Sequence, residues 1–245
     1  MAKMPARWMI KRPLLWLKGL AFDIFRREYQ VDGMRFSIPY DMTTRIFRAR
    51  FINDTYEKAE RVCVSEFVRP GMRVLELGAC LGVVSGMTNK ALGFSHEHVV
   101  IEANPRLIPW LTNNLQNNNC KTSVEHGLLS RSSDGTFYLH NLIVGGSNVR
   151  ETPMTTTVPV FNIDDLEDKY GLKFNALIMD IEGGEQAIID ENRDWLKSID
   201  LAIIEFHDFI LGDTELMRLR TVLEDVGLAR KQTRGSTEVW QRLVQ

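Results

Sequence analysis

The sequence predicts an α/β fold in which a mostly parallel sheet is covered by helices on both faces. Segments with strand and helix character alternate from about residue 73 onward, a pattern typical of parallel sheets with crossover helices. Two apolar runs, at 176–180 and 201–206, carry an acid at or near their end, as buried parallel strands often do. The chain of 245 residues, 44% apolar and 25% charged, is long enough to bury one sizeable core.

The elements of this sheet can be assigned in chain order. A helix at about 54–68, begun by Asp54, leads into the first strand. The last two of seven strands form an antiparallel hairpin that turns at 234–236, and residues 141–160 are expected to form a long loop. The expected sheet strands are 73–77, 98–102, 123–128, 176–180, 201–206, 228–232 and 237–242, with an extra strand at 136–140 and helices at 82–92, 105–117 and 214–226.

Charge is unevenly distributed along the chain. Residues 1–50 contain eleven Lys/Arg and four Asp/Glu, whereas the remaining 195 residues contain 19 and 28. We therefore divide the chain into a basic N-terminal arm, 1–53, and a globular domain, 54–245. A basic arm favours contact with an anionic surface, an anionic ligand or the acidic domain itself.

The arm is expected to hold an amphipathic helix that runs from Pro13, in its first turn, to about Glu28. One interpretation is peripheral contact of residues 7–28 with the cytoplasmic face of an anionic membrane, and the other is a cap or dimer contact packed on the domain. Residues 31–53 are expected to be irregular. The apolar side of the helix consists of Leu14, Leu17, Ala21, Ile24 and Phe25.

A cytoplasmic location is expected from two observations. The longest uncharged run near the N-terminus, 13–17, is too short for a signal peptide or a membrane span. The three cysteines, Cys63, Cys80 and Cys120, fit neither a disulfide framework nor a metal knuckle, which favours a reducing compartment.

A strand, a tight glycine turn and a helix start follow one another at 74–82. Gly78 and Gly82 let the backbone bend sharply and approach a ligand closely. Glu76 lies near the end of the strand, where open α/β sheets bind ligands. The spacing G-x-x-x-G differs from the G-x-G-x-x-G of dinucleotide-binding proteins. Glu102 ends the next strand, where an acid can accept two ribose hydroxyls.

Acids also follow the later strands. Asp180, Glu182 and Glu185 come after the fourth core strand, and Glu205 and His207 end the fifth. Acids are costly to crowd into one crevice unless cations or hydroxyl groups meet them. S-adenosylmethionine offers a sulfonium, an ammonium group and ribose hydroxyls. Glu76, the carboxylate beside the turn, suits the ammonium group of this cofactor, and it would repel the pyrophosphate of a dinucleotide.

In this order the acid-bearing segments resemble the FkbM family of methyltransferases. The match covers roughly residues 54–242 and includes Tyr56 and Glu57 before the first strand. Two departures, Cys80 where the family often has Asn and Gly184 where Ala is common, remove no charged group. Asp-x-Glu-Gly-x-Glu is the most specific part of the match. The four matching segments are 76–82, 102–105, 180–185 and 205–207.

The resemblance implies a Rossmann-like class I methyltransferase fold, with 54–245 as the methyltransferase domain. It also implies methyl transfer from S-adenosylmethionine to a hydroxyl of a sugar, glycan or other small molecule. Nitrogen-methylating relatives usually carry Asn/Asp-Pro-Pro-aromatic where this chain has 180–183, which favours oxygen. The cofactor-binding residues that it implies are Glu76, Gly78, Ala79, Gly82, Glu102, Asn104 and Leu129.

Two residues are candidates for the base that removes the hydroxyl proton, and both stay open. Asp180 lies nearest the expected methyl group, and His207 has an ordinary pKa of about 6.5, which suits neutral pH. Asp180, Glu182 and Glu205 could also ligate Mg²⁺. Glu182 and Glu185 stand at a helix start, however, where they are expected to bond backbone groups. A divalent metal is therefore not favoured, and no metal ligand is assigned.

Two other functions stand as alternatives. The missing G-x-G-x-x-G disfavours an NAD-type oxidoreductase, and the retained acids disfavour a non-catalytic interaction module with a methyltransferase-like fold. Nucleic acid is not expected as a partner, because the domain is net acidic despite Arg45, Arg48 and Arg50. The sequence indicates neither the acceptor nor the oligomeric state.

Overall fold

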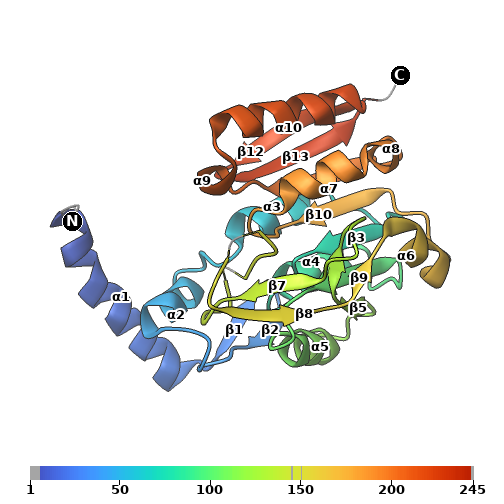
Figure 1. The fold of residues 1–245 in the computed structure, drawn as a ribbon. Helices are drawn as coiled ribbons and strands as arrows, with labels where there is room; N and C mark the ends of the chain where they lie inside the picture. The colour runs from blue at the N-terminus through green and yellow to red at the C-terminus, as the bar shows by residue number, and fades with distance from the viewer. Residues whose placement is uncertain (1–5, 145, 150, 244–245) are drawn as a thin grey trace.

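The computed structural model describes residues 6–144, 146–149 and 151–243, without the side chains of residues 6–11. In this part of the chain seven strands form the central sheet (Figure 1). Five are parallel, and the final strand pairs antiparallel with both of its neighbours, which confirms the predicted sheet and its C-terminal hairpin. From edge to edge the strands are β12 (Leu228–Arg234), β13 (Thr237–Arg242), β11 (Leu201–Glu205), β10 (Ala176–Met179), β3 (Val74–Leu77), β4 (His98–Glu102) and β5 (Ser123–His126).

Alternate side chains of the central strands point to opposite faces of this sheet. Val74 and Ile178 belong to one apolar core, and the helices that pack on that face form a first set. Leu75 and Leu177 belong to a second core on the other face, where a second set of helices packs. Helices therefore cover both faces, as predicted. The first set is α3 (Lys58–Phe67), α4 (Val83–Ala91) and α5 (Ile108–Asn117), and the second is α6 (Ile163–Tyr170), α7 (Glu185–Glu191), α8 (Arg193–Leu196) and α10 (Asp213–Asp225).

The order of the strands reverses beside β3. From β3 the chain continues outward to β4 and β5, and it then returns to place β10 on the other side of β3. In such sheets a crevice opens outside the carboxyl ends of the two strands at the reversal. Gly78, with φ +83°, follows β3 there, and a β-carbon on it would lie 1.8 Å from the carbonyl oxygen of Asp180. The turns after β3 and β10 therefore meet at a distance that requires glycine.

The N-terminal arm is more ordered than the sequence suggested. It contains α1 (Ala6–Phe25), a hairpin of β1 (Glu28–Val31) and β2 (Met34–Ser37), and α2 (Arg45–Ile52). The expectation that 31–53 is irregular was wrong, because Asp32 and Gly33, with φ of 50° and 80°, form a tight hairpin turn of the kind that Asp-Gly favours.

The predicted start of the first helix was also wrong. The helix begins at Ala6, so Pro13 lies inside it and not in its first turn. Proline there lacks the N–H that would bond the preceding turn. Within the described residues, no helix is both long enough and apolar enough to cross a bilayer. The division into 1–53 and 54–245 stays a prediction, although Phe22 and Phe51 share a core cluster with Val74.

Two further expectations differ from the structure. Asp54 does not begin α3, because its carboxylate accepts hydrogen bonds from Tyr29 and Arg61, and α3 starts four residues later. The segment 141–160 contains strands as well as loop, since its threonine-rich part pairs with the predicted extra strand. The strands outside the main sheet here are β6 (Leu128–Leu129), β7 (Thr136–Leu139), β8 (Met154–Thr157) and β9 (Val160–Phe161).

Gly19 lets α1 pack against α2, since a β-carbon on it would lie 1.8 Å from the carbonyl oxygen of Arg45. Gly19→Ala is expected to force the helices apart, to cost about 1–3 kcal/mol of unfolding free energy and to lower Tm in calorimetry. Leu17→Ala, on the exposed side of the same helix, is the control and should change stability by less than about 0.5 kcal/mol. Equal Tm values for the two variants would contradict this role of Gly19.

Candidate functional site

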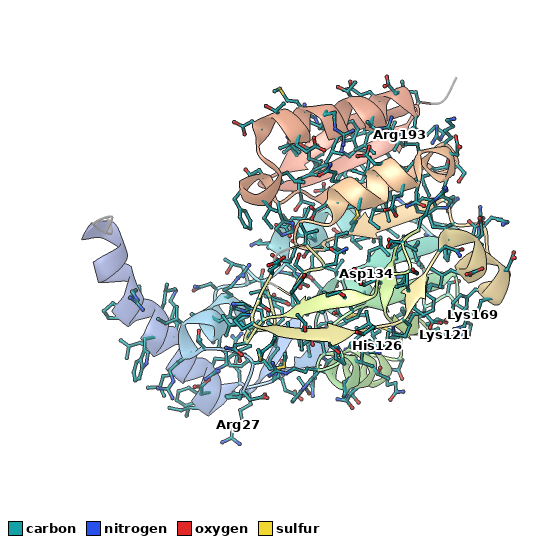
Figure 2. All side chains as sticks on the ribbon, viewed as in Figure 1. Arg27, Lys121, His126, Asp134, Lys169 and Arg193 are labelled. Carbon is teal, nitrogen blue, oxygen red and sulfur yellow. The ribbon has the colours of Figure 1, made fainter. Side chains whose placement is uncertain are left out.

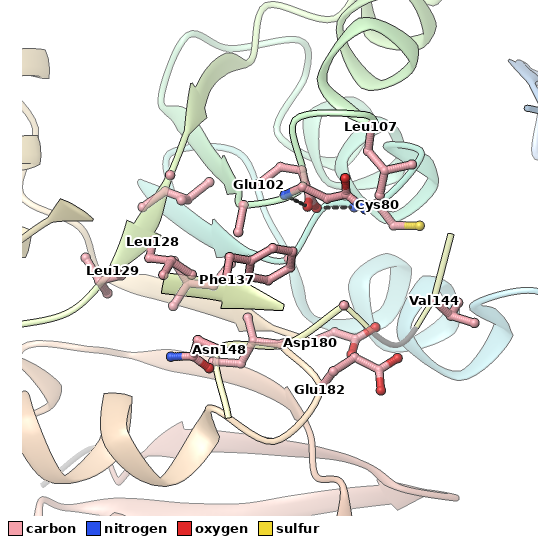
Figure 3. Close-up of a pocket in the computed structure, with 18 of the residues that line it drawn as sticks. Cys80, Glu102, Leu107, Leu128, Leu129, Phe137, Val144, Asn148, Asp180 and Glu182 are labelled. Atoms are coloured by element: carbon pink, nitrogen blue, oxygen red, sulfur yellow. Dashed lines mark hydrogen bonds between the residues drawn. The ribbon is translucent and has the colours of Figure 1, made fainter. Parts of the chain in front are cut away.

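A cavity opens at the carboxyl ends of β3, β4 and β10, where the strand order reverses (Figure 3). Its space, with the open solvent at its mouth included, is about 810 Å³. Its wall also contains apolar side chains such as Leu107, Phe137 and Ile188. Five of the residues predicted from the sequence line it together: Gly78, Glu102, Asn104, Leu129 and Asp180.

Glu102 is fixed on one wall of this cavity by backbone donors. The N–H of Cys80 donates to its Oε2 at 2.9 Å, and the N–H of Asn104 donates to its Oε1 at 2.7 Å (Figure 3). Burial raises the pKa of Glu102, and these N–H groups act in the opposite direction. Each carboxylate oxygen can accept more than one hydrogen bond, so Glu102 can still accept two hydroxyls from a ligand.

Ala79 and Gly82 do not line this main cavity. Ala79 is buried and lines a smaller adjoining cavity, which shares Gly78 and Asp180 with the main one. Gly82, with φ +79°, precedes α4, and a β-carbon on it would lie 2.7 Å from Leu111 of α5. Gly82 therefore sets the distance between the two helices that support the turn.

Glu76 lies outside the main cavity. It is 1% exposed, and its carboxylate hydrogen-bonds Ser85 Oγ of α4 and His98 Nε2 of β4. It lines the smaller cavity and not the main one. Both of its oxygens already hydrogen-bond other side chains of the protein. Glu76 is therefore better placed to hold α4 and β4 together than to bind the cationic group of a ligand.

Glu57 is an acid of the site that was not among the predicted site residues. It lines both cavities, and its Oε2 is enclosed without a hydrogen-bond partner among the described residues. Burial raises its pKa to about 8. Its backbone has φ 47°, a left-handed conformation that is uncommon outside glycine and is concentrated at functional sites. The sequence carried one signal, since Tyr56 and Glu57 belong to the family-like pattern.

His207 stands between β11 and α9 (Asp208–Leu211) and reaches the main cavity through its neighbours. Its Nδ1 lies 2.7 Å from Oε1 of the fully buried Glu185, which also accepts the N–H of Gly183. Its Nε2 lies 3.6 Å from Asp180 Oδ1 and 3.6 Å from Glu182 Oε2, and both of those residues line the cavity. Glu185 thus orients the ring so that Nε2 faces the cavity's acids.

This arrangement shifts the proton affinity of both candidate bases. Burial raises the pKa of Asp180 well above its usual value, and the nearby carboxylates Glu205 and Glu57 add to the rise. Burial alone lowers the pKa of His207. The hydrogen bond to Glu185 and the charges of nearby acids outweigh burial, and the pKa ends above its usual value. Both groups are therefore stronger proton acceptors than the free side chains.

A metal ion could be held by Asp180, Glu205 and His207, whose ligand atoms lie within 4.8 Å of one another. This group differs from the trio considered from the sequence, because His207 takes the place of Glu182. Glu185 accepts the backbone N–H of Gly183, as expected from its place at a helix start. A nitrogen and two carboxylate oxygens suit several divalent ions.

Ile143, Val144 and Asn148 bring the segment after β7 to the cavity wall. The N–H of Ile143 donates to the carbonyl of Met42 at 3.0 Å, so this wall is tied to the N-terminal arm. Phe209, 71% exposed, lies beside His207, with the two ring centroids 5.8 Å apart.

Solved methyltransferase structures resemble the chain at low identity. A precorrin-6y C5,15-methyltransferase from Geobacter metallireducens is 13% identical with a TM-score of 0.48, over 85% of this chain and 93% of that one. A methyltransferase from Pyrococcus furiosus is 11% identical with a TM-score of 0.47, over 96% and 99%. An O-methyltransferase from Bacillus cereus, in complex with SAH, is 15% identical with a TM-score of 0.42, over 94% and 89%.

No curated protein sequence matches the chain significantly. The sequence profile of the methyltransferase FkbM domain, in contrast, matches residues 76–228, more than half of the chain. That span includes the turn after β3, Glu102, Asp180 and His207, and so most of the cavity described above. The chain belongs to the FkbM methyltransferase family.

Proposed function

We propose that the protein is an S-adenosylmethionine-dependent O-methyltransferase that methylates a hydroxyl of a sugar, glycan or other small molecule. One observation carries the proposal: a single cavity has an acid suited to ribose hydroxyls on one wall and an oriented acid–base group at its other side. The acid suited to ribose hydroxyls is Glu102, and the acid–base group consists of Asp180, His207 and Glu185. Membership of the FkbM family supports the same reaction class.

The cavity offers a complementary group for each part of this cofactor. Glu102 would accept the ribose hydroxyls, and Asn104 and Leu129 would line the adenosine end. Glu57, with an unpartnered carboxylate oxygen, would meet the ammonium group, the role that the sequence had given to Glu76. Gly78 would let the backbone approach the ligand closely.

When bound, S-adenosylmethionine supplies an electrophilic methyl group on a cationic sulfur. The residues of this chain then have to align the acceptor hydroxyl and remove its proton. Alignment is worth up to about 7–11 kcal/mol of the barrier in favourable cases, and a positioned base typically adds about 10²–10⁴-fold. His207 Nε2 would take the proton, Glu185 would stabilise the resulting imidazolium, and Asp180 would accept a hydrogen bond from the hydroxyl before transfer.

Titration calorimetry with S-adenosylmethionine and S-adenosylhomocysteine, followed by radiolabelled methyl transfer to a panel of sugars and glycans, tests the function. Binding of both ligands and a labelled, base-stable ether product are expected. Binding of NAD in their place would favour an oxidoreductase. Binding without transfer to any hydroxyl compound would favour the non-catalytic module, and a labelled amine would rule out oxygen as the acceptor.

Glu57→Gln is expected to weaken S-adenosylmethionine binding about tenfold or more, because a hydrogen bond to a charged group contributes about 1.5–3 kcal/mol. With a pKa of about 8, Glu57 ionises as pH rises, so wild-type affinity should increase between about pH 6 and 7.5 while the variant stays flat. Calorimetry at several pH values checks both effects.

A stability readout separates this role from misfolding. A carboxyl whose pKa is raised by folding destabilises the fold as pH rises from about 4.5 towards 8. Unliganded Glu57→Gln should therefore be as stable as the wild type or more so at pH 8. Glu224→Gln, an exposed acid on α10, is the matched control and should bind normally. Unchanged affinity in Glu57→Gln would remove Glu57 from the cofactor site.

His207→Gln is expected to lower kcat by at least about 100-fold at saturating cofactor. The base must be unprotonated, so wild-type kcat should rise with pH through a midpoint above the ordinary histidine value, and the variant should lack this limb. Asp180→Asn should lower kcat but keep the rise of kcat with pH, with cofactor binding still measurable. The opposite pattern, a limb kept in His207→Gln and lost in Asp180→Asn, would make Asp180 the base.

Phe209→Ala is expected to raise the acceptor KM several-fold without changing cofactor affinity, if the acceptor is a sugar. The exposed ring beside His207 offers an apolar surface on which the C–H face of a sugar can pack. Phe209→Tyr should behave as the wild type. Met217→Ala, another exposed apolar residue, is the control in steady-state kinetics. Equal KM values for Phe209→Ala and this control would exclude such packing.

A further inference from the structure

One side of α1 packs against the rest of the protein. Phe22 is completely buried and lies 5.3 Å, ring to ring, from Phe51 of α2. Asp23 on the same side accepts hydrogen bonds from Arg45 and Arg48. This side explains how α1 is held but not why the rest of the helix is apolar.

The other side of α1 is an apolar stripe that the body leaves uncovered. Its large side chains are 55% to 81% exposed, so the described residues do not cover them as a packed cap would require. At helical spacing they occupy an arc of about 100°. In Figure 1 the helix lies at the edge of the molecule, beside α2. The stripe consists of Leu14 (55% exposed), Leu17 (55%), Ala21 (part-buried), Ile24 (56%) and Phe25 (81%).

The sequence around the stripe is strongly basic. Residues 1–27 contain seven Lys/Arg and one acid, Asp23, whose charge is already met by Arg45 and Arg48. Arg12, Arg26 and Arg27 are exposed, and Figure 2 shows Arg27 extending from the end of the α1 region into solvent. The apolar stripe therefore lies in a positive field with no exposed acid in α1 among the described side chains.

We propose that α1 binds the surface of an anionic phospholipid bilayer, with the stripe inserted among the headgroups and acyl chain ends and the arginines against the phosphates. Apolar burial and phosphate attraction act together in this arrangement, as in interfacial helices. A second copy of the chain fits less well, because pairing two stripes would bring two basic surfaces together.

Co-sedimentation with vesicles tests this proposal without any methyl transfer, so its outcome is independent of the proposed function. The intact protein is expected to bind vesicles of phosphatidylcholine mixed with phosphatidylglycerol at least about tenfold better than phosphatidylcholine alone, and less at high salt. Leu17→Glu/Phe25→Glu should lose at least about tenfold of that binding. Both changed positions are exposed, so Tm and cofactor binding should stay as in the wild type.

Met217→Glu is the matched control, since Met217 is 58% exposed on α10, and it should bind vesicles as the wild type does. Wild-type protein that stays in the supernatant with anionic vesicles would overturn the proposal. Equal vesicle binding by wild type and the double variant would overturn it as well. Sedimentation equilibrium of both proteins supplies the competing outcome: a wild-type dimer that the double variant dissociates, without vesicle binding, assigns the stripe to a second copy.

Discussion

The contact between the turn after β3 and the turn after β10 determines where the site can be. At Gly78 the two backbones meet so closely that a β-carbon would collide with the carbonyl of Asp180. Because these strands flank the reversal in strand order, the contact closes the floor of the crevice that opens there. Glu102, from the neighbouring strand, then faces the cavity across from Asp180 and Glu182 (Figure 3). The backbone contact at Gly78 therefore determines where the acids of the site can lie.

The acids gathered at this edge explain the unusual proton affinities of the site. Glu57 and Glu205 raise the cost of ionising Asp180 in a partly dry crevice, and burial raises the pKa of both Asp180 and Glu57. The protein therefore holds protons on groups that would be charged in water. A cationic ligand would relieve this repulsion on binding, which makes its affinity depend on pH in a way that a neutral ligand's would not.

The fold was largely predictable from the sequence because apolar runs and glycine turns mark buried strands and their connections. Glu102 and Asp180 were predictable for the same reason, since strand ends meet at one edge of a sheet. Glu76 was misleading, because the sequence does not tell which face of a strand a residue takes relative to Ser85 and His98. Glu57 comes from a segment outside the strands, so the family-like pattern marked it in the sequence without placing it at the cavity. The Asp32-Gly33 pair is itself a local sequence signal for the tight hairpin turn found there.

The tie between Ile143 and Met42 has a consequence for how the molecule can be divided. Residues that define the family begin at 76, yet Phe36 and Met42 are buried in the cluster that also contains Val83 and Leu201. A fragment cut to the family span would leave that apolar surface to water and would remove the support behind one wall of the cavity. The stretch that identifies this enzyme family is therefore shorter than the stretch whose side chains build the apolar core and support the cavity wall.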